Sequence, residues 1–107
     1  MCATADGKRV LSGARDNTVK LWDLAEGKAI RTFVGHSFSV YGVDLSRDGK
    51  LCVSGSWDHT VRLWSIESGQ QLVVYEDYSS RFNTVAFDAD ATLIIAASSA
   101  GTIHCLR

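Results

Sequence analysis

Apolar and polar residues alternate in short runs along this chain. In the run 60–66, the apolar side chains of Val61 and Leu63 flank the charged Arg62, and the run 18–24 repeats this order. Alternation with a period of two places the apolar residues on one face of a β-strand. The pattern predicts four strands in the middle of the chain, at residues 40–45, 51–56, 60–66 and 71–75. No run has a helical period, so we expect an all-β protein.

Short polar segments separate the predicted strands. The chain has 9 glycines and 0 prolines, so its turns depend on glycine and aspartate. The segment 47–50, Arg-Asp-Gly-Lys, is typical of a hairpin turn in which Gly49 can adopt a positive φ without steric cost. The segments 57–60 and 67–70 supply the next two turns.

Most of the stretch 48–64 also occurs 42 positions earlier, at 6–22. A weaker third copy follows at the same offset, with Asp90, Leu93, Ser98, Thr102 and Ile103 at positions that match the second copy. A period of about 40 to 45 residues is that of one four-stranded β-propeller blade. The repeat therefore predicts propeller blades at about 1–33, 34–75 and 76–107. The last blade is incomplete, which gives about two and three-quarter blades.

Composition and charge narrow the classes of function. The chain has 107 residues, 46% of them hydrophobic, with 11 basic and 12 acidic side chains. This balance gives no support for nucleic acid or an anionic membrane surface as partner. No apolar run approaches the roughly 20 residues that span a bilayer, and the N-terminal residues lack the features of a signal peptide. We expect a cytoplasmic protein.

Three cysteines, Cys2, Cys52 and Cys105, lie far apart in the sequence and lack metal-ligand spacing. They indicate neither a disulfide framework nor a zinc site, and we expect reduced thiols packed as small hydrophobic side chains. His59 and His104 also have no neighbours at metal-ligand spacing. We expect no metal and no cofactor.

Several short motifs resemble those of tryptophan-aspartate (WD) repeats, and the resemblance covers nearly the whole chain. They are Gly35-His36, Ser54-Gly55-Ser56, Asp58, Leu63-Trp64 and, in the first copy, Leu21-Trp22-Asp23. In that family a His, a strand-two Ser, a turn Asp and a strand-three Trp form a hydrogen-bonded tetrad. The resemblance implies this tetrad at His36, Ser54 or Ser56, Asp58 and Trp64, with Ser12, Asp16 and Trp22 as its members in the first copy.

A blade that is buried on both faces needs partners for its few polar groups, which is a structural reason for such a tetrad. The same Ser, His and Asp could instead be interpreted as a hydrolase triad. The sequence has no Gly-x-Ser-x-Gly elbow, and Ser12 and Asp16 repeat the residues in the neighbouring copy. We therefore expect a scaffold and no enzyme. The third copy departs most from the pattern, with Asp77-Tyr78, Ala100 and Leu106 at tetrad positions.

WD-repeat propellers mostly act as rigid platforms, and they usually bind partners through the face at the starts of the innermost strands. The resemblance maps this face onto Ser39, Tyr41, Trp57, Arg81, Asn83, Ser99 and Arg15. Aromatic and arginine side chains often dominate the energies of protein interfaces. Trp57 is our first candidate; alternatively, it only covers the turn of its own blade.

A propeller needs at least four blades to close, so fewer than three leave apolar faces and one strand edge open. The chain is expected to be part of a longer propeller, or to assemble head to tail with other copies. The sequence thus predicts a non-catalytic scaffold for protein–protein interaction. The alternatives are a structural module that closes a ring by homo-oligomerisation and, third, a hydrolase that uses Ser, His and Asp.

Overall fold

The computed structural model describes residues 2–3, 8–13, 17–77, 81–88, 93–99, 101 and 103–106. Within these ranges all regular structure is β. The strands are β1 (Cys2–Ala3), β2 (Arg9–Gly13), β3 (Thr18–Asp23), β4 (Lys28–Val34), β5 (Val40–Leu45), β6 (Leu51–Ser56), β7 (Thr60–Ser65), β8 (Gln71–Glu76), β9 (Phe82–Phe87), β10 (Ile94–Ser98) and β11 (Ile103–Leu106).

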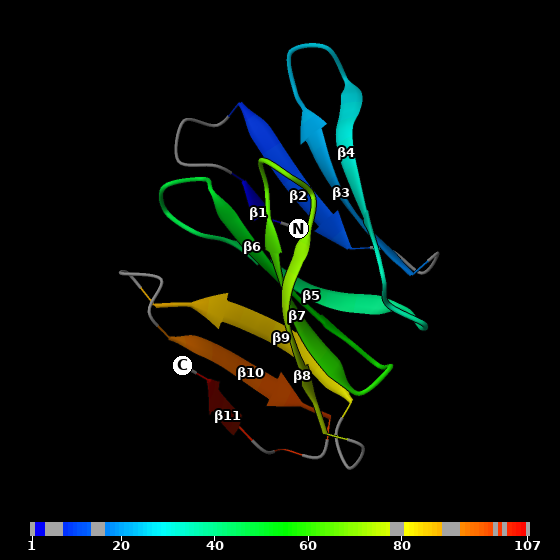
Figure 1. Cartoon of the computed structure of the whole chain (residues 1–107), viewed down its shortest axis with the longest axis vertical. Coiled ribbons are helices and arrows are strands. Elements are labelled where there is room, and N and C mark those ends of the chain that lie inside the picture. Colours follow the sequence, from blue (N-terminus) through cyan, green and yellow to red (C-terminus); the bar gives the residue numbers. More distant parts are fainter. Residues whose placement is uncertain are drawn as a thin grey trace.

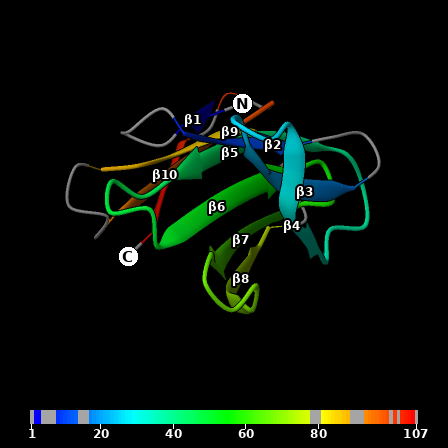
Figure 2. The ribbon, with the colours of Figure 1, turned by 90° about the horizontal axis from the view of Figure 1, so that it is seen from above.

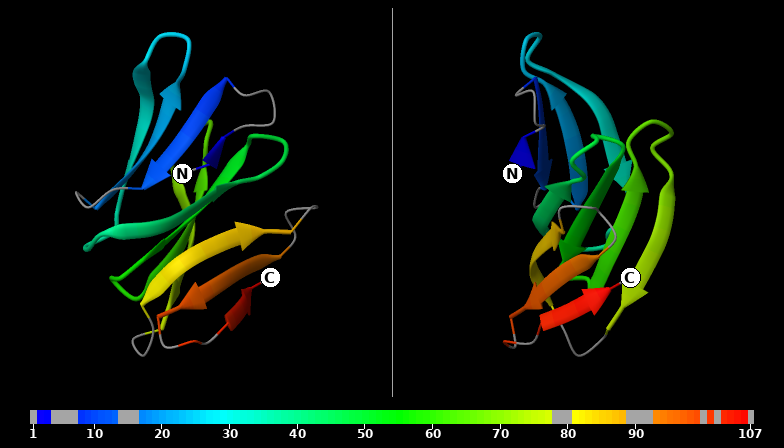
Figure 3. Two further views of the ribbon diagram at one scale, coloured as in Figure 1. Left: turned by 180° about the vertical axis from the view of Figure 1, so that it is seen from behind. Right: turned by 90° about the vertical axis from the view of Figure 1, so that its left-hand side faces the viewer.

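The strands form three antiparallel sheets, and within each sheet consecutive strands of the sequence pair with one another. The first sheet has the order β1-β2-β3-β4, the middle sheet β5-β6-β7-β8 and the third sheet β9-β10-β11. The three sheets follow one another along the molecule, with the middle sheet between the other two (Figures 1 and 3). This arrangement confirms the prediction of all-β propeller blades.

The strand bounds agree closely with the alternation of the sequence. Strands β5 and β6 have the predicted bounds, whereas β7 ends one residue earlier and β8 continues one residue further. The turns also repeat: Asn17, His59 and Gly101 occupy the same position in the three copies and have φ values of 72°, 72° and 83°. Gly49 has the expected positive φ, at 73°.

The middle sheet is buried on both faces because two hydrophobic cores flank it. Along β6, Cys52 belongs to the core shared with the first sheet, and its neighbour Val53 belongs to the core shared with the third. The first core contains Leu11, Val19, Leu21, Phe33, Val40, Leu45, Cys52, Trp64 and Ile66. The second contains Val53, Val61, Phe82, Val85 and Ala96.

Glycines allow the inner strands of neighbouring sheets to approach closely. A Cβ atom on Gly42 of β5 would lie 2.6 Å from the Cα of Thr84 in β9. Gly13 and Gly55, which correspond in the repeat, would likewise clash with Val40 and Val85 of the next sheet. As a result β1, β5 and β9 lie on one side of the molecule, with β8 on the opposite side (Figure 2).

The cysteines differ in their surroundings. Burial raises the pKa of the Cys52 thiol to about 12, and this thiol packs in the first core as expected. For Cys105 the expectation of burial is wrong, because its side chain is exposed on β11. This strand has a neighbour on one side only, so nothing in the described sheet covers its outer edge. The side chain of Cys2 lies outside the described residues.

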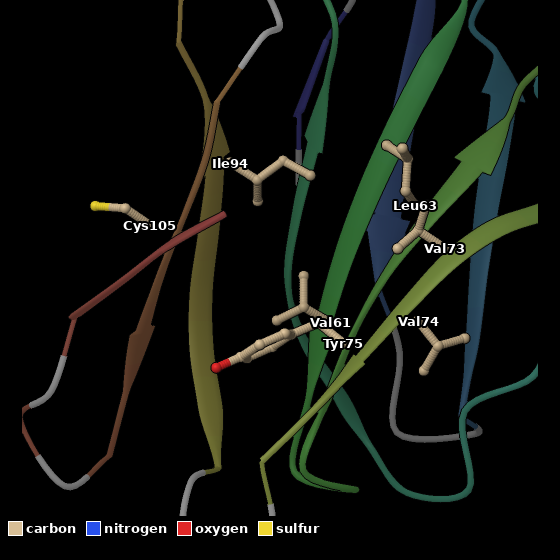
Figure 4. Close-up of a pocket in the computed structure, with 7 residues that line it drawn as sticks. All are labelled: Val61, Leu63, Val73, Val74, Tyr75, Ile94 and Cys105. Atoms are coloured by element: carbon tan, nitrogen blue, oxygen red, sulfur yellow. The ribbon is translucent and has the colours of Figure 1, made fainter. Parts of the chain in front are cut away.

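An apolar groove of about 330 Å³ separates the outer parts of the middle and third sheets. Its lining comes from β7 and β8 on one side and from β10 and β11 on the other (Figure 4): Val61, Leu63, Val73, Val74, Tyr75, Ile94 and Cys105. In the equivalent space between the first and middle sheets, the Trp64 and Phe33 ring centroids lie 5.5 Å apart. The third copy has the smaller Leu106 at the position of Trp64.

No described segment forms a helix that is long and apolar enough to cross a membrane.

Candidate functional site

Four polar side chains of the middle sheet form a continuous chain of hydrogen bonds. The indole N–H of Trp64 donates to the Ser54 Oγ at 2.9 Å. The Ser54 hydroxyl lies 2.6 Å from the Nε2 of His36, and the Nδ1 of His36 lies 2.8 Å from the Oδ2 of Asp58. Since an ionised carboxylate can only accept, His36 donates from Nδ1 and its Nε2 accepts the Ser54 proton.

Asp58 is the most heavily bonded member of this chain. Its Oδ2 accepts the backbone N–H of Ser37 at 3.0 Å, and its Oδ1 accepts both the backbone N–H (2.9 Å) and the hydroxyl of Thr60. Burial alone would raise the pKa of this carboxyl. The hydrogen bonds from His36, Thr60 and Ser37 outweigh burial and hold the pKa well below its usual range.

Ser56 lies outside this chain of bonds, although it shares a face of β6 with Ser54. Its hydroxyl bonds the backbone oxygens of Phe38 at 3.1 Å and Ser39 at 2.8 Å, and it accepts the N–H of Asp58 at 3.0 Å. Ser56 stands at the end of β6, next to the segment that leads into β5. It therefore fixes that segment and leaves the His36 ring to Ser54.

The first sheet repeats one hydrogen bond of this chain, the bond from the tryptophan indole to the serine hydroxyl. Trp22 Nε1 donates to the Ser12 Oγ at 2.8 Å, with the same spacing as Trp64 and Ser54. The equivalent aspartate, Asp16, lies outside the described residues. Trp22 is only half-buried, whereas Trp64 is 2% exposed and packs against the preceding sheet.

The buried position of Ser54 separates this arrangement from a hydrolase triad. Ser54 is 0% exposed, and its oxygen lies between the Trp64 indole and the His36 ring. A nucleophile must instead present its oxygen to a substrate carbonyl. In this arrangement Ser54, His36 and Asp58, together with Trp64, join strands β6 and β7 to the segment before β5 and to the turn between β6 and β7.

The second group of predicted residues gathers at the end of the sheets where β5 and β9 begin. The rings of Tyr41 and Trp57 stack with centroids 4.5 Å apart and planes 31° apart. The indole N–H of Trp57 donates to the Oδ1 of Asn83 at 2.7 Å, and the Arg81 guanidinium lies 5.2 Å from the Trp57 ring centroid. We call Ser39, Tyr41, Trp57, Arg81, Asn83 and Ser99 the Trp57 face.

Backbone hydrogen bonds hold the remaining members of the Trp57 face in place. The N–H of Trp57 donates to the Ser39 oxygen at 3.2 Å, and one repeat later the N–H of Ser99 donates to the Arg81 oxygen at 2.8 Å. Arg15, the predicted member from the first copy, lies outside the described residues. Six of the seven predicted residues thus lie at one end of two adjacent sheets.

Two residues that the motifs did not single out also belong to the site. Besides its bonds to Asp58, the Thr60 Oγ1 lies 3.2 Å from the His36 Nδ1. Arg62 donates from Nε to Thr60 at 3.2 Å and also bonds the Gln71 amide oxygen. Thr18, Thr60 and Thr102 recur at the 42-residue offset, so the repeat itself contained the signal for Thr60.

In the ranges that the structure describes, no three His, Cys, Asp or Glu side chains come together where they could hold a metal ion.

Comparison with known proteins agrees with this geometry. The family described as "WD domain, G-beta repeat" matches residues 1–23 and 27–65, which is more than half of the chain. The chain belongs to the WD-repeat family. The match includes the tetrad residues Ser54, Asp58 and Trp64 of the middle WD repeat.

Three relatives each match less than half of this WD-repeat chain. The F-box/WD repeat-containing protein 7 of Drosophila melanogaster is 45% identical over 40 residues, which are 37% of this chain and 3% of that protein. Autophagy-related protein 16 of Arabidopsis thaliana is 43% identical over 47 residues, which are 44% of this chain and 9% of that protein. The Lissencephaly-1 homolog of Branchiostoma floridae is 51% identical over 37 residues, which are 35% of this chain and 9% of that protein. The chain thus matches less than a tenth of each relative.

Replacing Ser54 by Ala should lower the free energy of unfolding by about 2 kcal/mol, because the buried groups of Trp64 and His36 lose their shared partner. The matched change Ser12→Ala in the first WD repeat should cost about 1 kcal/mol, since the half-buried Trp22 indole can turn to water. Urea unfolding followed by tryptophan fluorescence measures both. Equal losses in the two variants would contradict the difference in burial.

Asp58 should make stability depend on acid pH. Because its folded pKa lies below the reference value of 3.8, it stabilises the folded state above about pH 4, and this contribution disappears as the pH falls toward the folded value. The stability difference between the wild type and Asp58→Asn should therefore shrink between pH 6 and pH 3, as measured by urea unfolding. Other carboxylates cancel in this comparison, and a difference that stays constant would disprove the prediction.

Proposed function

We propose that this WD-repeat chain is a non-catalytic scaffold that binds other proteins or peptides through the Trp57 face. The observation that carries the proposal is the stack of Tyr41, Trp57 and Arg81 at one end of two adjacent sheets. Tyr41 is 45% exposed, Arg81 is exposed and Trp57 is half-buried. Large aromatic and arginine side chains that combine apolar area with directed polar groups are the types that most often anchor protein interfaces.

The rigidity of its support favours the Trp57 face over other exposed apolar residues. Trp57 directly precedes Asp58, whose carboxylate is fixed by His36 and Thr60. A side chain that is held in place before binding loses less conformational entropy when a partner arrives. Phe38 and Val34 are also exposed, but no ring contact of the described residues fixes either of them.

Changing Trp57 to Ala should weaken partner binding at least tenfold, because truncating an aromatic anchor costs about 2 kcal/mol or more. The loss of thermal stability should be modest, since the indole is half-buried. Affinity is measured by titrating a partner captured with the wild-type chain, and stability by thermal unfolding.

Two control variants make this test specific. Leu72→Ala removes a side chain that is 50% exposed on β8, away from the Trp57 face, and should leave affinity unchanged. Trp57→Phe keeps a ring for stacking but loses the bond to Asn83. Unchanged affinity with a lowered melting temperature in Trp57→Ala would mean that Trp57 only covers the turn of its own blade.

We further propose, as a second candidate, that copies of the chain associate along the open edge of the third sheet. In the two four-stranded sheets, β4 and β8 pair with β3 and β7, whereas β11 of the third sheet lacks such a neighbour among the described strands. Ile103 on β11 is 71% exposed, and Val73, which lines the adjoining groove, is 55% exposed. An unpaired edge beside apolar surface favours the addition of a strand.

If copies associate in this way, light scattering of the wild-type chain should give a mass above that of one chain. Ile103→Lys should shift the mass toward the monomer, because a charge on the edge opposes strand pairing. Phe38→Lys, which places the same charge at another exposed apolar position, should leave the mass unchanged. A monodisperse wild-type monomer would refute self-association.

A further inference from the structure

The Arg81 guanidinium is positioned by an aromatic ring and leaves its charge available. It lies over the Trp57 ring, with its Cζ 5.2 Å from the ring centroid, and Arg81 is exposed to solvent. Among the described residues, no carboxylate pairs with it. A guanidinium that stacks through its face keeps the N–H groups at its edge free for two parallel hydrogen bonds.

Several hydrogen-bond acceptors at or next to the Trp57 face already have donors within the protein. The Oδ1 of Asn83 accepts from Trp57 and, because an indole N–H can only donate, this bond turns the Asn83 NH₂ group away from the ring. The backbone oxygen of Ser39 accepts from the Trp57 N–H and the Ser56 hydroxyl. Asp58, the next carboxylate after Trp57, is enclosed by His36, Thr60 and Ser37.

The Trp57 face therefore offers more donors than acceptors. The guanidinium of Arg81, the amide NH₂ of Asn83 and the hydroxyl of Tyr41 can all donate to a partner. The nearest carboxylates before Arg81 in the described sequence, Glu76 and Asp77, lie at the end of β8, the outermost strand of the middle sheet, and each has an interaction of its own.

We infer that the Trp57 face takes an acidic peptide segment, with an Asp or Glu carboxylate on the edge of Arg81 and an apolar side chain against Tyr41 and Trp57. This inference rests on the proposed function, because it names the chemistry of the partner at the same face. A carboxylate supplies both the negative charge and the acceptor oxygens that this surface lacks. A lysine-rich segment would bring donors to donors and repel Arg81.

Selection from a phage library of random 12-residue peptides tests the inference directly. The library is selected separately on the immobilised wild-type chain and on Arg81→Gln, Trp57→Ala and Arg47→Gln. Arg47 is an exposed arginine in the turn after β5, at the opposite end of the middle sheet, so it is a matched control for Arg81. Circular dichroism checks that each variant is folded.

Peptides selected on the wild type and on Arg47→Gln should be enriched in Asp and Glu about threefold or more over the library, and those selected on Arg81→Gln should not. For a synthetic selected peptide, Arg81→Gln should raise the Kd about tenfold, or about 1.4 kcal/mol. Replacing the peptide's critical Glu by Gln should weaken binding to the wild type by a similar factor and to Arg81→Gln hardly at all.

The outcomes separate this inference from the proposed function. Peptides that need Trp57 but show no acidic enrichment, or that bind Arg81→Gln and the wild type equally, overturn the acidic partner and leave the Trp57 face as a binding surface. Peptides that bind Trp57→Ala as well as the wild type overturn both.

Discussion

The hydrogen-bonded chain from Trp64 through Ser54 and His36 to Asp58 is the interaction on which the middle sheet depends. It joins β7, β6, the segment before β5 and the turn between β6 and β7. Because the two hydrophobic cores bury both faces of this sheet, water cannot satisfy these groups, and each must find its partner within the protein. The side chains that resemble a catalytic triad are therefore used to hold the fold together.

The same packing assembles the Trp57 face from two sheets. Gly42 allows β5 to approach the backbone of β9 at Thr84. The neighbours of these residues, Tyr41 and Asn83, then both contact Trp57, which stacks on Tyr41 and donates to Asn83. A surface that depends on this approach keeps its shape only while the two sheets stay packed, so the geometry of the Trp57 face depends on core packing.

The sequence predicted the fold well because strand alternation and the 42-residue period both report on local geometry. It could not choose between Ser54 and Ser56, which lie on the same face of one strand; the choice depends on how the segment before β5 folds back onto the sheet. It also predicted burial for Cys105, because the alignment with the middle copy assumes a strand that has neighbours on both sides, whereas β11 has one neighbour in the described sheet. Residue spacing alone carries no information about whether a neighbouring strand is present.

Trp22 and Trp64 show how much the adjacent sheet contributes. Both make the same bond to a serine, yet Trp64 is buried by the first sheet and Trp22 remains half-buried. The third copy has Ala100 and Leu106 at tetrad positions, and its inner strand β9 is held by Phe82 in the second core and by the bond from Ser99 to the Arg81 oxygen. Arg81 and Asn83 flank Phe82, so their positions depend on apolar packing and on the middle sheet. For this reason a degenerate repeat can still supply half of the Trp57 face, because it packs against a repeat with a complete hydrogen-bonded chain.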